Sequence, residues 1–186
     1  MDRKKQKILV LAAVLVLVTL FSRSTLAYYT VTGIATNVVT SGEIRLRIHE
    51  TDENGHPFPK EGVHVIPGDV VDKVVTVQNV CHHPFWLRVE LVRDSTGEAL
   101  SAEDALEILD FNDSNWTLWG DYWYYQDILY PGEETEPLFT QVEIVGKYVD
   151  QYDIGSALTL TVKAYAVQSE NNPADHPWEV SGWPEA

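Results

Sequence analysis

Apolar and polar residues alternate along much of the chain from residue 43 onward. In the segment EIRLRIHE, Ile44, Leu46 and Ile48 share one side, while the residues between them are charged or histidine. The same period of two returns in 85–91 and in 157–168. Such alternation is typical of β-strands with one buried face. The pattern therefore predicts an all-β protein.

The other β-rich segments complete a set of short strands separated by turn-forming residues. They lie around 63–66, 70–80, 122–129 and 138–145. Strands of this kind, with turns between them, predict a β-sandwich. The last strand is expected to turn one row of side chains inward and the other row outward. The inward row is Leu158, Leu160, Val162, Ala164 and Ala166, and the outward row is Thr159, Thr161, Lys163 and Tyr165.

The segment SAEDALEIL, residues 101–109, interrupts the strand pattern. Ser101 and Asp104 form a variant of the capping box that begins helices. Four residues then share a helical apolar face, namely Ala102, Ala105, Leu106 and Leu109. We expect one short crossover helix here, closing an edge or an end of the sandwich.

Two Pro-Gly-acid segments precede predicted strands, Pro67–Gly68–Asp69 and Pro131–Gly132–Glu133. Proline fixes one backbone angle, and glycine tolerates the positive φ of a type II turn. We expect the chain to reverse at both places.

The N-terminus has the three parts of a secretory signal. Residues 1–7 carry four basic side chains, and the apolar run of 8–21 is too short for a spanning helix of about 20 residues. Thr25 and Ala27 are the small residues before a cut at Tyr28. We expect residues 1–27 to be removed on export, leaving one domain (28–170) and an irregular tail (171–186). The alternative is an uncleaved N-terminal anchor.

Charge restricts the partners of the mature chain. The full sequence holds 13 basic and 28 acidic residues, and the signal removes five and one of these. The remaining 8 against 27 give a formal charge of −19. Such a surface repels nucleic acid and anionic membranes. We therefore expect no nucleic-acid partner, membrane contact only before cleavage, and weak binding of divalent cations.

No catalytic or metal-binding motif stands out. The histidines lack the HExxH spacing of zinc proteases, and neither a GxSxG nor an SxxK motif occurs. The loops TDENG and NDSN hold calcium-ligand residue types without the spacing of an EF-hand. Cys81 is the only cysteine, so no disulfide framework exists; we interpret it as a small filler, with a thiol nucleophile or metal ligand as the alternative. We assign no catalytic residue, metal or cofactor.

An aromatic run lies in NWTLWGDYWYYQD, residues 115–127. One interpretation is a stacking platform for a sugar or a protein, and the favoured one is packing within the fold. In a strand, Trp123 and Tyr125 face one way while Tyr122 and Tyr124 face the other. The tail can drape over the sheet through Trp178 and Trp183, or remain disordered.

The junction TLAYYTVTGIATNVVTSGEIRLRI and the strands after it resemble a known family. They are similar to the SipW-dependent secreted proteins, the TasA/camelysin group of Gram-positive bacteria. The likeness extends over 25–168 and includes VIPGD, WYY…ILYPGEETEPLFTQVEI and LTLTVKAYAVQ. Val31 stands where that family often has aspartate.

The resemblance implies a jelly-roll-like antiparallel sandwich that is secreted into the extracellular or biofilm matrix. The protein would be a fibre subunit or a fibre accessory, with copies of itself or related matrix proteins as partners. A SipW-type signal peptidase would act during export, recognising Thr25, Ala27, Tyr28 and Tyr29. The freed segment 28–42 would donate a strand to the next subunit through Tyr28, Tyr29, Val31, Gly33, Val38 and Val39.

Alternatives to this function stay open. Residues 28–40 can instead form the first strand of their own sandwich. The protein can also be a camelysin-like secreted metallo-endopeptidase, although the chain has no zinc motif. A third alternative is a non-polymerising cell-surface binding module that uses the aromatic run. If subunits do assemble, screening of their charge predicts more assembly with salt, divalent cations or falling pH.

Overall fold

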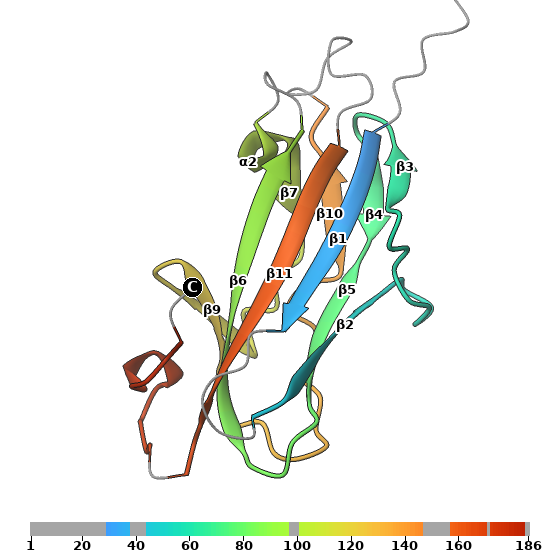
Figure 1. The fold of residues 1–186 in the computed structure, drawn as a ribbon. Coiled ribbons are helices and arrows are strands. Elements are labelled where there is room, and N and C mark those ends of the chain that lie inside the picture. Colours follow the sequence, from blue (N-terminus) through green and yellow to red (C-terminus); the bar gives the residue numbers. More distant parts are fainter. Residues whose placement is uncertain (1–28, 38–43, 97–100, 147–156, 171, 185–186) are drawn as a thin grey trace, which may run out of the picture.

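The structure is a computed structural model that describes residues 29–37, 44–96, 101–146, 157–170 and 172–184. The described residues form two layers of β-sheet stacked face to face (Figure 1). The predicted all-β sandwich is thereby confirmed. The signal segment 1–27 lies outside the described residues.

The first layer is a six-stranded sheet with its two longest strands at the centre. Its order is β3 (Val63–Val65), β1 (Tyr29–Asn37), β11 (Ala157–Gln168), β6 (Phe85–Ser95), β9 (Tyr122–Tyr125) and β8 (Trp116–Trp119). Neighbouring strands are antiparallel except for β1 and β11, which run parallel. The sheet is therefore mixed at one position, between the first and the last strand of the described residues.

The second layer contains β2 (Leu46–Thr51) paired with β5 (Val74–Asn79), and β10 (Gln141–Ile144) lying between β4 (Val70–Asp72) and β7 (Leu106–Ile108). Backbone hydrogen bonds join these two parts. The amide of Lys73 donates to the carbonyl of Thr140 (2.7 Å), and that of Thr135 donates to Val77 (2.9 Å). The chain at 133–144 thus runs beside 69–79 as one continuous antiparallel pair.

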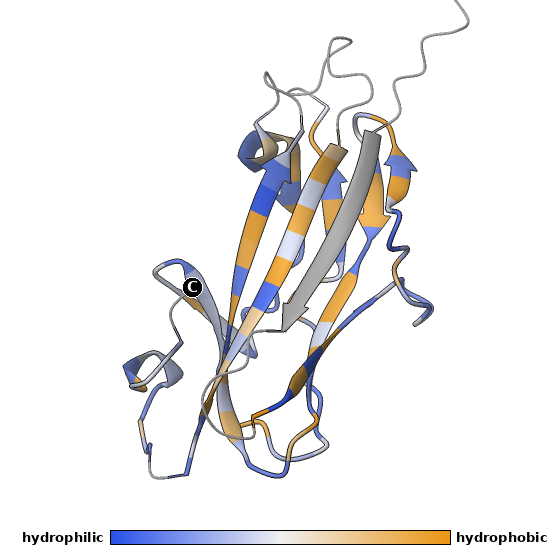
Figure 2. Cartoon of the chain, viewed as in Figure 1, coloured by the Kyte–Doolittle hydropathy of each residue, from blue (hydrophilic) through white to orange (hydrophobic). Residues whose placement is uncertain are grey.

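The hydrophobic core lies between the layers. The inward row predicted for 157–168 is fully buried, and Phe85, Leu87 and Val89 of β6 lie beside it. Figure 2 shows the corresponding bands of hydrophobic residues along β6 and β11. Facing them from the other layer are Val75, Val77, Phe139, Val142 and Ile144. Full burial of one such side chain stabilises the fold by about 1.5–3 kcal/mol.

The predicted helix is shorter than its sequence pattern. Helix α2 spans Ala102–Ala105 only, and Ser101 makes no side-chain cap. Leu106 begins strand β7, where it lies opposite Ile144, and Leu109 is exposed. Pairing with β10 thus decided the conformation of residues that a helical period also fits.

Two further differences concern the outer face of the first layer. Strand β8 precedes the strand expected around 122–129, and that strand is itself shorter, as β9 (Tyr122–Tyr125). Tyr165, expected to face outward into solvent, is buried beneath other aromatic side chains. Tyr165 points to the outer face of β11, as predicted, but other side chains cover that face.

The two Pro-Gly-acid segments form tight turns with the same geometry. Gly68 has φ 93° and Gly132 has φ 85°, and in each turn the acidic residue's amide donates across the reversal (3.0 Å). The carboxylates of Asp69 and Glu133 each accept from the backbone amide three residues earlier (2.9 Å). These turns hold the ends of β4 and of the 133–144 segment in place.

Candidate functional site: the slot of the N-terminal strand

Strand β1 lies in a slot between β3 and β11 (Figure 1). Residues 30–37 pair in parallel with 157–164, from Thr30 opposite Ala157 to Asn37 opposite Ala164. On its other side β1 pairs with β3 over three residues, with Tyr29 opposite Val65. One side of the slot is therefore long and the other short.

The long side of the slot is a well-supported strand. β11 pairs with β6 along its whole length, from Leu158 opposite Ser95 to Gln168 opposite Phe85. Its inward side chains are fixed in the core. If β1 were absent, the edge of β11 over 157–164 would present unpaired backbone groups, which proteins rarely leave bare. The slot is thus a site that needs a strand.

The short side of the slot is β3, an edge strand that ends at the Pro67 turn. Val65 anchors it in the core, while Val63 is only partly buried. With three residues of pairing, β3 covers a small part of β1. The slot consequently has one long, well-supported side and one short side.

The structure places the predicted donor and recognition residues as follows. Tyr29, Val31 and Gly33 belong to β1. Thr25, Ala27, Tyr28, Val38 and Val39 lie outside the described residues. In this single chain, 29–37 form a strand of their own sandwich, which is one of the two interpretations of the segment. β1 runs parallel to β11, a direction that alternation within one strand cannot predict, because it carries no information about a distant partner.

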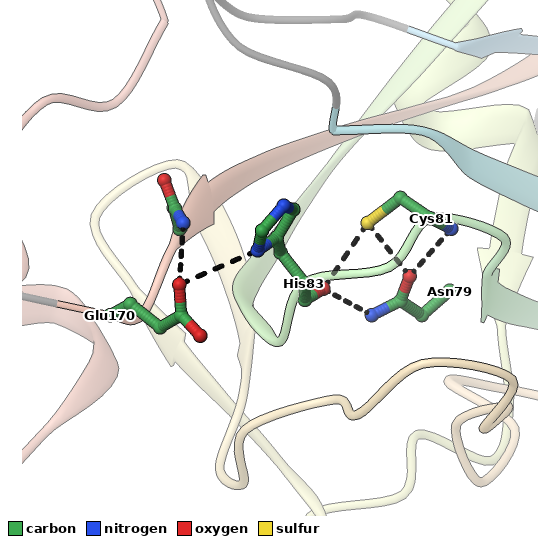
Figure 3. A network of polar contacts seen from close by, with 5 residues as sticks. Asn79, Cys81, His83 and Glu170 are labelled. Carbon is green, nitrogen blue, oxygen red and sulfur yellow. Dashed lines mark hydrogen bonds and ion pairs between the residues drawn. The ribbon is translucent and has the colours of Figure 1, made fainter.

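Cys81 lies in a buried polar network at the end of β5 (Figure 3). Its sulfur is 3.0 Å from Asn79 Oδ1 and 3.2 Å from the carbonyl of His83. The amide nitrogen of the fully buried Asn79 side chain donates to the carbonyls of His83 and Leu129 (both 2.9 Å). The thiol therefore helps to shape the connection between β5 and β6.

The ring of His83 belongs to a different contact. Its Nδ1 lies 3.4 Å from Glu170, on the side away from the thiol (Figure 3). The His83 ring is thus not placed to take a proton from Cys81, as the base of a thiol nucleophile would be. Among the described residues, no group of three potential metal ligands occurs. The network has the geometry of a structural connection.

A buried ion pair that no local sequence pattern predicts lies in the second layer. Lys73 has no exposed surface, and its Nζ is 2.7 Å from Glu50 Oε1 and 4.2 Å from the centre of the Phe58 ring. Burial lowers the pKa of Lys73, and the charge of Glu50 acts in the opposite direction. This pair ties β2 to the junction of β4 and β5.

The aromatic run is mostly packed inside the fold. Trp116 and Tyr125 are buried, and Trp123 stacks on Phe111 (4.1 Å). Tyr122 and Tyr124 face the opposite side of the sheet, in line with the predicted alternation. There they meet Arg88, whose guanidinium carbon is 3.8 Å from the centre of the Tyr122 ring.

The C-terminal segment 172–184 covers that outer face. Trp183 packs edge-to-face on Tyr124 (5.7 Å), and its ring centre is 4.9 Å from the guanidinium of Arg88. Arg88 Nη2 donates to the carbonyl of Pro184 (2.9 Å), and Trp86 Nε1 donates to that of Asn172 (3.1 Å). The described part of the tail is therefore draped on the sheet through its tryptophans, one of the two arrangements expected.

Comparison with known proteins finds no matching family model, no matching curated protein and no matching solved structure. Within the described residues, no helix has the length and apolar character to cross a membrane.

Proposed function

We propose that the mature chain is a secreted structural protein of the extracellular or biofilm matrix, a fibre subunit or fibre accessory. Copies would join by strand addition, with residues 28–41 of one copy occupying the β3–β11 slot of the next. The resemblance to the TasA/camelysin group supports this function, and a SipW-type peptidase would release the donor segment by cutting after Ala27.

The position of β1 is the observation that carries the proposal. The strand that fills the slot begins within two residues of the proposed cut. It is held mainly by backbone pairing with β11. Backbone pairing depends little on which chain supplies the strand, so the segment of a second copy can make the same hydrogen bonds. The slot therefore fits either a strand of its own chain or a donated one.

Competition between these two arrangements sets the conditions for assembly. A strand on the same chain acts at an effective concentration of about millimolar when its linker is short. A donor strand from another copy must compete with this effective concentration. It can do so through a high local concentration of subunits or through stabilisation of the whole polymer. The formal charge of −19 opposes close approach, so salt and divalent cations should favour exchange.

The test compares chains that begin at Tyr28 and at Gly42, using electron microscopy and sizing. We expect fibres or large oligomers from the first, increasing with salt, and none from the second. Adding a synthetic peptide of residues 28–41 to the shorter chain should raise its thermal stability without producing fibres, because the peptide fills the slot but links nothing. A peptide with the same residues in scrambled order is the control.

Two results would contradict the proposal. Polymers formed equally by both chains would place the assembly contact elsewhere. A Tyr28 chain that stays monomeric across salt, calcium and acidic pH would mean that β1 serves its own sandwich only.

A further inference from the structure

Trp119 is an exposed tryptophan at the tip of the β8–β9 hairpin. Its exposed fraction is 59%, the highest among the large apolar residues of the described ranges. The rest of the aromatic run is buried or half-buried in the sheet and beneath the tail. Packing thus accounts for the run except at this one position, where a large apolar ring is kept in solvent.

Trp119 is the outermost ring of a surface stack. It lies nearly parallel to Trp178 of the 3-10 helix η1 (Pro177–Glu179), with ring centres 5.4 Å apart and planes at 17°. Trp178 in turn stacks on His176, at 4.5 Å and 7°. One face of Trp119 is therefore covered by Trp178, and its large exposure belongs to the opposite face and the ring edge.

Rigid elements hold this stack in place. Trp119 lies opposite Tyr122 in the hairpin, whose two-residue turn contains Gly120 at φ 62°. Pro177, the first residue of η1, is buried, and Val180, directly after η1, packs with Trp86 and Val167 of the sheet. A flat ring that is already fixed loses little conformational entropy when a ligand stacks on it.

Two hydrogen-bond acceptors neighbour the stacked rings in the sequence. Asp175 and Glu179 flank these rings along the chain and, with Pro173 and Ala174, line a surface hollow of about 360 Å³. Both carboxylates are exposed and form neither an ion pair nor a side-chain hydrogen bond within the described part of the chain. A flat apolar ring with polar acceptors nearby in the chain is the kind of surface that a polar organic ligand binds.

We propose that this platform, formed by Trp119, Trp178, His176, Asp175 and Glu179, binds a neutral or amino-substituted polysaccharide. The C–H face of a pyranose ring would stack on the open face of Trp119, an amphipathic ring suited to such contacts. Hydroxyl or amino groups of the neighbouring sugar would donate to the carboxylates. The formal charge of −19 excludes anionic polysaccharides, which the surface would repel.

The platform is independent of strand addition. β8 forms the opposite edge of the six-stranded sheet from β3, so the platform and the slot are separated by the width of that sheet. A chain that never polymerises can still bind a polysaccharide here, and the two proposals therefore fail separately.

The experiment measures how much of the chain beginning at Tyr28 is retained on insoluble cellulose, chitin and chitosan at physiological salt. Tryptophan fluorescence is measured in parallel with soluble oligomers of the same sugars. We expect retention on at least one of them. Trp119→Ala should weaken it by about tenfold, the equivalent of about 1.4 kcal/mol. Leu118→Ala is the matched control, because Leu118 is 53% exposed on the same strand but on its other face, and it should leave retention unchanged.

Several outcomes would overturn the proposal. They are no retention on any of the three polymers, equal retention of Trp119→Ala, and retention lost equally in the Leu118 control. Sedimentation of the same variants tests for a protein partner. Self-association that Trp119→Ala abolishes, without any polysaccharide binding, would assign the platform to a contact between copies instead.

Discussion

Lys73 and Glu50 form a buried ion pair, with 2.7 Å between Nζ and Oε1 and no exposed surface on the lysine. Glu50→Gln would leave a buried ammonium without a counter-charge. Breaking such a pair costs about 3–5 kcal/mol, so the free energy of unfolding should fall by that amount in urea titrations at neutral pH. A change below about 1 kcal/mol would mean that the interior of this layer is well hydrated.

The control for that variant is Lys73→Met with Glu50→Gln in the same chain. It removes both charges and keeps most of the volume beside Phe58. Replacement of a whole buried pair by groups of similar shape is often neutral or stabilising. The double variant should therefore recover most of the stability lost in Glu50→Gln.

The local sequence pattern was sufficient to predict most of the strands and turns. It did not predict which strands pair with each other. The inward row of β11 and the two Pro-Gly-acid turns followed from a period of two and from the backbone freedom of glycine. Leu106 fits both a helical face and a strand, and pairing with Ile144 decided between them. The sequence has no local signal for a contact of that kind.

The candidate site was predictable only in part for the same reason. That 29–37 form a strand could be predicted from their β-branched residues. Its parallel pairing with β11 joins residues more than 120 positions apart, which no local period reports. Likewise, Lys73 shares the period-two row of the buried Val75 and Val77, but no local pattern identifies Glu50 and Phe58, which the folded sheets bring around it.

The tail should depend on Arg88. Its guanidinium packs against Tyr122 and Trp183 and donates to the carbonyl of Pro184, while its Nε makes no hydrogen bond. Arg88→Met keeps an apolar stem but loses the cation–π contacts, worth about 0.5–2 kcal/mol, and the bond to the tail. Limited proteolysis should cut within 172–184 several times faster than in the parent chain.

Arg47→Met is the control for the tail experiment, because Arg47 is an exposed arginine of β2 in the other layer. Its cleavage rate should equal that of the parent. Unchanged protection of the tail in Arg88→Met would show that Trp178 and Trp183 hold it without the arginine.

The two Pro-Gly-acid turns should respond alike to substitution. A Cβ at Gly68 or Gly132 would meet no atom within 4 Å, so only the positive φ opposes it. Gly68→Ala and Gly132→Ala should each lower the free energy of unfolding by about 1–2 kcal/mol. Pro131→Ala should cost less, about 0.4–1 kcal/mol, since it acts through the unfolded chain. If denaturant titrations gave very different losses of unfolding free energy for the two glycine variants, the two turns would not be equivalent.

A reversible lock on β1 should decide which chain fills the slot. Thr32 lies opposite Thr159 in the β1–β11 register, so cysteines at these positions, in a Cys81→Ser background, can form a disulfide within one chain or between two. If strands exchange, oxidation of dilute monomers should trap β1 in its own slot and abolish fibres, and reductant should restore them. Oxidation of preformed fibres should instead give covalent ladders on non-reducing gels. Thr32→Cys alone is the control and should assemble in either redox state. Only intramolecular disulfides in every sample would restrict β1 to the sandwich of its own chain.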